Sequence, residues 1–254
     1  MGAPLRLVFN PTGGLDEAAR DCEADVFRHW YGNTREQLVD EYAPYERDSV
    51  FLAVADEHDD VLACGRFLTG ATAELKTIVD VQRPPWGVDA PRAAAAVGVD
   101  LTRTWDLATM GVRRGVRRGT TRLASALYHG FTTAVRVNRV AAMIAILDER
   151  AHQVVASAGV HLQALPGTRP EPYLGSPASR PVYARTAAYL DYQRRHSPEA
   201  HRLLTLGVGL DGVQVPERAH FRLDPFRLAP SVPSRVTIPA PARELVSVGT
   251  RSQG

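Results

Sequence analysis

The chain has 254 residues, 44% of them hydrophobic, which is enough to bury a core as one large domain or as one domain with an appendage. Its 30 basic and 28 acidic residues leave a formal net charge of +2, which weighs against a general polyanion-binding protein. Two cysteines, Cys22 and Cys64, are too few for a disulfide framework and lack metal-ligand spacing, so we expect a cytoplasmic protein without a metal site.

The first hundred residues predict two helices and a β-hairpin. In the first helix, apolar side chains recur every four residues and so share one face. Two runs rich in β-formers flank a polar turn, which predicts the hairpin. Residues 69–103 show no regular pattern, because "RPPWG" interrupts any single element. The expected elements are a helix at 15–31, a helix at 34–43, and strands at 49–55 and 61–68 around a turn at 56–60.

The next hundred residues alternate strands and helices. Leu123, Leu127, Phe131 and Val135 recur every four residues and predict one helix face. The apolar run "VAAMIAIL" is typical of a strand buried on both faces and is too short to cross a bilayer, so we expect no membrane association. The expected elements are a strand at 104–112, a helix at 120–138, a strand at 139–147, a helix at 148–159 ended by Gly159, and strands at 160–165 and 181–190.

This order of elements predicts an α/β (α+β) fold, with a mixed sheet and helices on both faces. We expect the main domain to span residues 1–190 and an extension to span 191–254. In the extension, Ser197 as N-cap and Pro198 at the first helical position predict a helix. After about residue 225 the chain is Pro-rich, which favours an extended or disordered tail that the core does not need.

An arginine-rich turn, "RRGVRRG", lies between the expected strand at 104–112 and the helix that follows. A helix N-terminus presents unpaired backbone N–H groups and a partial positive charge, both of which suit a phosphate. Gly119 would let the backbone approach such a ligand closely. The turn matches neither a Walker P-loop nor a dinucleotide-binding turn. On charge pattern alone, a solvated turn is the other interpretation.

The stretch "VRRGVRRGTTRLASAL", followed by "AAMIAILDERAHQVVASAGV", resembles the core of the GNAT acyltransferases. The resemblance implies a twisted, mostly antiparallel sheet, and a turn that binds the pyrophosphate and pantetheine of an acyl carrier. Thr121 and Leu123 stand where the family usually has glycine. The implied donor-binding residues are Met110, Val112, Arg117, Arg118, Gly119 and Thr120.

Upstream, "VDEYAPYERDSVFLAVADEHDDVLACGRFL" and "WDLATMGV" look like the acyl-homoserine-lactone synthases and the N-acyl amino acid synthases. This likeness covers roughly residues 20–190 and implies Glu46, Arg66 and Asp106 as site residues. Ala43 replaces an expected acidic residue and Thr109 an expected arginine. Those positions serve S-adenosylmethionine and site organisation in the lactone synthases, so that substrate becomes the alternative here.

Acyl transfer from a thioester to an amine needs a proton acceptor and a polarised carbonyl. Glu46 and Asp106 are the candidate bases, with Glu46 slightly favoured, and backbone N–H groups of the central strand could hold the oxyanion. Arg66 could grip an acceptor carboxylate at two points, or pair with either candidate base. No enzyme nucleophile is required, and Cys64 in an apolar strand is expected to belong to the core.

Four further side chains carry weaker signals. His129 and His161 are isolated histidines, which are more often structural than catalytic. Tyr128 and Tyr173 could protonate a departing thiolate, although nothing in their spacing singles them out.

The sequence therefore predicts an N-acyltransferase that moves an acyl group from acyl-CoA or an acyl-phosphopantetheine carrier to a small amine such as an amino acid. No permanently bound cofactor is expected. Three alternatives stay open: an autoinducer-type synthase, a transferase using aminoacyl-tRNA, and a binding module without turnover. An acyl carrier protein partner and a homodimer also stay open.

Overall fold

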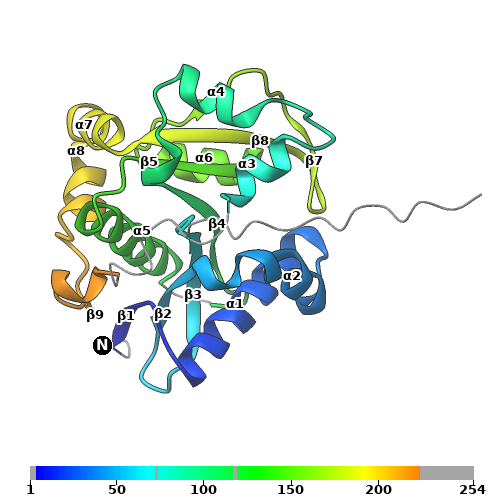
Figure 1. The fold of residues 1–254 in the computed structure, drawn as a ribbon. Coiled ribbons are helices and arrows are strands. Elements are labelled where there is room, and N and C mark those ends of the chain that lie inside the picture. Colours follow the sequence, from blue (N-terminus) through cyan, green and yellow to red (C-terminus); the bar gives the residue numbers. More distant parts are fainter. Residues whose placement is uncertain (1–3, 72–73, 117–118, 224–254) are drawn as a thin grey trace, which may run out of the picture.

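The computed structural model describes residues 4–71, 74–116 and 119–223. Within them, one sheet runs in the order β6-β8-β5-β4-β3-β2-β1-β9, with β7 paired to β8 (Figure 1). Only the pairs β4–β5 and β1–β9 are parallel. The strands are β1 (Leu5–Phe9), β2 (Ser49–Ala55), β3 (Val61–Leu68), β4 (Thr104–Val112), β5 (Ala142–Asp148), β6 (Gln163–Ala164), β7 (Glu171–Tyr173), β8 (Ser176–Arg185) and β9 (Val213–Gln214).

Side chains of β2 alternate between two cores. Those of Val50, Leu52 and Val54 pack against α5 (Thr120–Val137), whereas those of Phe51 and Ala53 pack on the side of α1 (Gly14–Tyr31). Figure 1 shows the two helices on opposite sides of β2 and β3. Both faces of the sheet are therefore covered, which confirms the expected fold class of a mixed, mostly antiparallel sheet with helices on both faces.

The other half of the sheet has its own helices. Helices α3 (Lys76–Val81) and α4 (Ala90–Ala96) pack against Ala142, Ile144 and Tyr183 of β5 and β8. Further along the chain, α6 (Glu149–Ser157) contacts β5, and α7 (Thr186–His196) contacts β8. Both α3 and α4 come from the stretch 69–103 that showed no regular pattern.

Most expected elements are confirmed. Helices α1, α5 and α6, strands β2, β3 and β4, and the short α2 (Arg35–Tyr42) lie where the sequence predicts them, within a few residues. A capping box between Thr34 and Gln37 begins α2. β5 starts later than expected, and Gly159, with φ +74°, follows α6 as the predicted stop.

Two predictions at the C-terminal side are wrong in part. The stretch 181–190 is a strand only to Arg185, after which α7 begins with Thr186. The helix expected from Ser197 is α-helical only over Pro198–Ala200 (α8) and continues as a π-helix over His201–Thr205. The Ser197 side chain makes no cap hydrogen bond.

The described part of the extension packs onto the main body. β9 joins the edge of the sheet beside β1, and the buried Phe221 lies 5.4 Å from Phe9 between ring centroids. Asn138 fixes this segment by bonding the Phe221 carbonyl and the Leu223 amide. The division at residue 190 stays a prediction, and the tail after residue 225 lies outside the described residues. In the described chain, no helix has both the length and the apolarity needed to span a membrane.

Candidate active site between diverging strands

The central parallel pair of strands separates part-way along its length. β4 and β5 pair from Thr104–Ala142 to Asp106–Ile144 and no further. Beyond that point β4 stays with β3 and β5 stays with β8. A cavity of about 490 Å³ opens between the two strands, lined by the β4 residues from Asp106 to Val112 and by the end of β5. Two strand edges that face each other without pairing leave backbone groups for a ligand to bond.

β4 also carries a bulge at the start of this cavity. Against β3, Thr109 pairs with Arg66 and Leu107 pairs with Phe67, which leaves Ala108 as an extra residue. A bulge bends the strand locally and interrupts its ladder. Ala108 lines the cavity, so the interruption lies at the ligand-accessible edge.

Asp106 stands where the strands part. Its side chain is 2% exposed, and its carboxylate accepts hydrogen bonds from the Thr77 amide at 2.5 Å and the Thr77 hydroxyl at 2.9 Å. Burial raises the pKa of Asp106 to about 6, although the Thr77 bonds oppose the shift. Near neutral pH this carboxylate is therefore a base that can be protonated with little cost.

Glu46 and Arg66 do not line the cavity. Glu46 is half-exposed and pairs with Arg20 at 2.5 Å and with Arg66 at 3.7 Å. Arg66 is 3% exposed, and its main partner is Glu23, held by both Nε and Nη2. The structure thus brings Arg66 and Glu46 together, as one interpretation expected, and places Asp106 apart from them.

Glu23 is the buried partner that sequence reasoning missed. It is 1% exposed and also accepts a 2.6 Å hydrogen bond from the Thr109 hydroxyl. The guanidinium of Arg66 lies over the Tyr42 ring at 4.2 Å and over the Phe51 ring at 4.6 Å. This closed network forms a wall behind the cavity, and Tyr42 and Thr109 are its members that face the ligand space.

Lys76, the only lysine in the chain, lines the cavity next to Thr77. Its ammonium group contacts three partners, Asp80, Glu41 and the Tyr173 hydroxyl, the last two at 2.6 Å. Burial works against the charged form, but the two carboxylates outweigh it and raise the pKa of Lys76. These contacts join α2, α3 and β7 at one end of the cavity.

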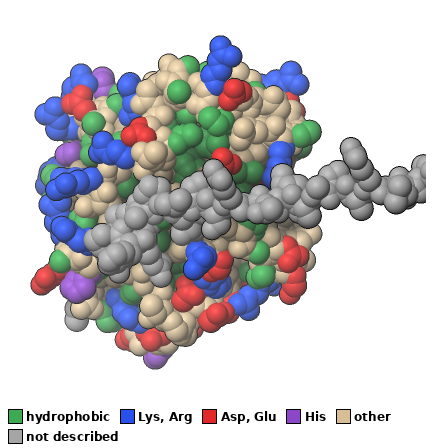
Figure 2. Space-filling model, in the orientation of Figure 1, with side chains coloured by type: hydrophobic (Ala, Val, Ile, Leu, Met, Phe, Trp, Pro, Cys, Tyr) green, Lys and Arg blue, Asp and Glu red, His purple; other side chains and the backbone are tan. Residues whose placement is uncertain are grey.

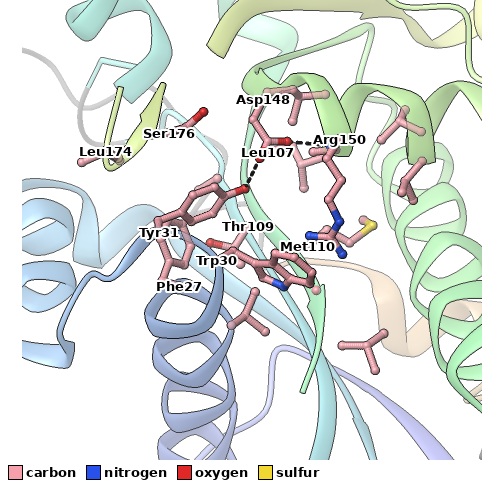
Figure 3. A pocket seen from close by; sticks show the side chains of 18 of the residues that line it. Phe27, Trp30, Tyr31, Leu107, Thr109, Met110, Asp148, Arg150, Leu174 and Ser176 are labelled. Atoms are coloured by element: carbon pink, nitrogen blue, oxygen red, sulfur yellow. Dashed lines mark hydrogen bonds between the residues drawn. The ribbon is translucent and has the colours of Figure 1, made fainter. Parts of the chain in front are cut away.

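Two further pairs cross the cavity from α1 to the β5–α6 junction (Figure 3). The Tyr31 hydroxyl donates a 2.8 Å hydrogen bond to Asp148, which also caps α6 through the Ala151 amide. Burial, and then the Asp148 carboxylate, raise the pKa of Tyr31. Next to it, the guanidinium of Arg150 lies 3.2 Å from the centre of the Trp30 ring.

The residues implied for donor binding lie along β4 and at the start of α5. Met110, Val112 and Thr120 line the cavity. Gly119, at φ +86°, is the N-cap of α5 and is exposed. Arg117 and Arg118 lie outside the described residues. The neighbouring Arg113 and Arg114 line the cavity, where Arg113 pairs with Asp25.

A small apolar pocket of about 30 Å³ adjoins the main cavity. It shares Leu107, Met110 and Tyr128 with the larger space and continues under Phe131 and Met143. Burial raises the pKa of Tyr128 to about 12, so its hydroxyl stays protonated near neutral pH.

The remaining candidates lie away from the reaction space or are held by partners. His129 bonds the Leu204 carbonyl, and His161 stacks on Tyr192. Cys64 is buried against Cys22 beneath α1, where the contact with that thiol and then burial raise the pKa of Cys64. Tyr173 is bound to Lys76 and Asp80. Within the described residues, no group of three His, Cys, Asp or Glu side chains is arranged to hold a metal.

Comparisons with known proteins support this architecture at the level of the fold. A CoA-dependent acyl-homoserine lactone synthase, BjaI, solved with SAM and isopentyl-CoA, is 18% identical at a TM-score of 0.55, covering 87% of this chain and 97% of its own. FeeM, an N-acyl amino acid synthase from uncultured soil microbes, is 9% identical at a TM-score of 0.51. The match covers 75% of this chain and 96% of FeeM. The AHL synthase LasI is 10% identical at a TM-score of 0.50, and the match covers 73% of this chain and 91% of LasI.

The fold is GNAT-like. The solved structures that share it include acyl-homoserine-lactone synthases and an N-acyl amino acid synthase, which agrees with the fold that the sequence resemblance implied. No family model and no curated protein matches the sequence.

Proposed function

We propose that this protein is an N-acyltransferase, which transfers an acyl group from a thioester donor to the amine of a small molecule. The observation that carries the proposal is the cavity between the diverging strands β4 and β5, with the buried Asp106 at its apex. Structural neighbours solved or named as acyl-transferring synthases are consistent with this chemistry.

The unpaired edges of β4 and β5 suit an extended donor arm that carries amide groups. Such an arm would bond to the backbone as an added strand would, with its phosphates towards Arg113, Arg114 and the start of α5. Acyl-CoA and an acyl carrier protein both present this phosphopantetheine arm. The small apolar pocket beside Met110 offers space for an acyl end.

In the reaction, Asp106 accepts the proton of the attacking amine. The amine nitrogen forms a bond to the thioester carbonyl, the carbon–sulfur bond breaks, and a thiol leaves after protonation. Backbone N–H groups at the Ala108 bulge would stabilise the developing oxyanion. Tyr128, which lines both spaces, is the candidate donor of the thiol proton.

The test is a product screen that combines acyl-CoA and acyl carrier protein thioesters with candidate amines, read by liquid chromatography and mass spectrometry. Asp106→Asn should lower kcat by about 10² to 10⁴, because it removes the proton acceptor and keeps its shape. The wild-type rate should rise with pH through about 6, where Asp106 becomes ionised, and this limb should vanish in the variant.

Glu46→Gln is the matched control, since Glu46 lies outside the cavity lining and should change kcat only a few-fold. If Glu46→Gln alone abolished the acidic limb, Glu46 would be the base. If no thioester and amine yielded a product, the acyltransferase assignment itself would be wrong.

A further inference from the structure

The end of the cavity around Lys76 and Asp106 is rich in carboxylates, and we call it the acidic end. Asp106 lines it, Glu41 and Asp80 lie behind that lining as partners of Lys76, and Lys76 is its one basic lining residue among those the structure describes. The rings of Tyr42 and Tyr173 also face it. Ring faces and carboxylates both favour a cation.

The Lys76 ammonium has no donor left for a ligand. An ammonium group has three N–H bonds, and Asp80, Glu41 and the Tyr173 hydroxyl match that number. Its charge is also exceeded locally by the two carboxylates that hold it. A ligand carboxylate placed here would find no unpaired positive charge.

Arg66, the cation whose motif suggested an acceptor site, is equally occupied. Glu23 holds two of its nitrogens, and Nη1 contacts the Ser49 hydroxyl at 3.3 Å. Its planar faces are covered by Tyr42 and Phe51. Arg66 therefore cannot provide the two-point grip on an acceptor carboxylate that its sequence motif left open.

Basic groups are concentrated elsewhere along the cavity. Arg113 and Arg114 line it at the far end of β4, and Arg150 lines it on α6, stacked on Trp30 (Figure 3). The cavity is thus basic where a donor's phosphates would enter and acidic at the Asp106 apex. Its two ends suit ligands of opposite charge.

We infer that the acceptor is a cationic amine without a free carboxylate, such as an amino-acid amide or ester, or a simple alkyl amine. The inference rests on the proposed function and narrows its acceptor. An ammonium ion enters the acidic end favourably and releases one proton to solvent; the neutral amine then attacks the thioester, and Asp106 accepts its second N–H proton. A carboxylate beside the same three side chains would be desolvated among like charges, which is costly.

The test compares amino acids with their own carboxamides, which lack the carboxylate, at equal concentrations of the neutral amine form, because the amide has the less basic amine. Leucine and phenylalanine are each paired with the corresponding amide, with the same acyl-CoA as donor. We expect kcat/KM to be at least about 10-fold higher for each amide, with added amide also raising the Tm more than the amino acid does. Equal or better values for the amino acids would overturn the inference.

Asp80→Asn sharpens the test, because it removes one charge from Lys76 and leaves the side-chain volume. Lys76 then has one carboxylate partner fewer and can attract a ligand carboxylate. The ratio of kcat/KM for the amide to kcat/KM for the amino acid should therefore fall by about 3-fold or more. Glu199→Gln, remote from the cavity and exposed, is the control and should leave the preference unchanged. An unaltered preference in Asp80→Asn would show that Lys76 pairing does not set the specificity.

Failure of this inference is separable from failure of the proposed function. Donor binding is read alone, as the Tm shift given by CoA thioester without an amine. If the donor binds and amino acids are acylated, only the acceptor class is wrong. If the donor binds and neither amines nor amino acids bind or react, the acyltransferase assignment fails together with the acceptor inference. If the donor does not bind, the acyltransferase assignment fails first.

Discussion

At the scale of single residues, Arg66 and Glu23 form an ion pair that is shut away from solvent. Both side chains are almost completely buried, and each is fully hydrogen-bonded. Removing one member leaves the other as an unpaired charge in the protein interior. Arg66→Ala should therefore lower the free energy of unfolding by about 3–5 kcal/mol.

The double variant Glu23→Gln/Arg66→Met is the comparison. It removes both charges, so its loss of stability in urea unfolding should be clearly smaller than that of Arg66→Ala. If Arg66→Ala instead kept full stability and raised only the acceptor KM, Arg66 would bind the acceptor after all. The outcome thus decides between the two roles that the sequence left open.

Short family-like motifs directed attention to Asp106 and Arg66 in the sequence, and the structure places Asp106 on the cavity and Arg66 in a buried ion pair; their roles in a reaction stay predictions. The sequence could not predict the pairing of Arg66 with Glu23. Glu23 lies between the buried Ala19 and Phe27 on α1, on a face that otherwise reads as apolar. A charge in an apolar stripe was the available signal, but its partner is 43 residues away and is fixed only by packing.

At the scale of elements, the β7–β8 hairpin closes one side of the cavity. Leu174 and Gly175, at φ +45° and +85°, form its two-residue turn, and positive φ at both positions is what a type I′ turn requires. A Cβ on Gly175 would meet the carbonyl oxygen of Tyr31. The turn therefore rests directly on the helix that supplies the Tyr31–Asp148 pair.

Gly175→Ala should push this hairpin away from α1. We expect a loss of about 1–3 kcal/mol in the free energy of unfolding, together with weaker donor or acceptor binding. Gly87→Ala is the matched control, because Gly87 has φ +61° with open space around its Cβ position. Similar losses of stability and unchanged KM values in both variants would show that only the backbone conformation matters.

The arginine turn before α5 is the second element-scale prediction. Arg117→Ala/Arg118→Ala should raise the apparent KM for the donor and leave the fold intact, because each charge-assisted hydrogen bond to a phosphate contributes about 1.5–3 kcal/mol to binding. Arg194→Ala/Arg195→Ala, at the end of α7, is a control for the removal of two surface charges. An unchanged donor KM in Arg117→Ala/Arg118→Ala would show that the turn is only a solvated surface turn and does not bind the donor.

That control also addresses the nucleic-acid alternative. Figure 2 shows Arg side chains gathered beside α7 and α8, on a surface that elsewhere mixes both signs of charge. A fall in tRNA affinity with the Arg194 and Arg195 changes, and with added salt, would favour the RNA donor.

Elements with a strong period were predictable, and those fixed by tertiary context were not. The β2–β3 hairpin was found because β-formers flank a polar turn. The stretch 186–190 was misassigned because "TAAYL" continues an apolar strand without a break, and only the docking of Tyr189 and Gln193 makes it helical. Helices α3 and α4 have six and seven residues, too short for a period to emerge.

At the scale of the whole molecule, the extension splits into a packed part and a tail. A chain ending at residue 225 should keep the Tm of the full chain, because the described core ends with Leu223. A chain ending at residue 211 would lose β9 and Phe221 and should be strongly destabilised. Phe221→Ala alone should cost about 3–5 kcal/mol, since Phe221 is fully buried.

Thermal unfolding of the three variants tests this division. A large drop in Tm for the chain ending at residue 225 would show that the tail is an integral part of the core or of a dimer. Normal stability without residues 212–254 would instead place the domain boundary near residue 190, where the sequence predicted it.

The separation of β4 from β5 divides the sheet into two parts that the chain visits in turn. It leaves two half-sheets, one built on β1 to β4 with β9 and the other on β5 to β8. The chain passes from the first to the second at α3 and back at β4, then over again at β5, and returns at β9. Counted with the helices α3 and α4 that cover the second half-sheet, neither half is continuous in sequence, and the four crossings tie the halves together. We therefore expect the two halves to unfold as one cooperative unit, and a ligand to enter the opening between them without two domains having to close around it.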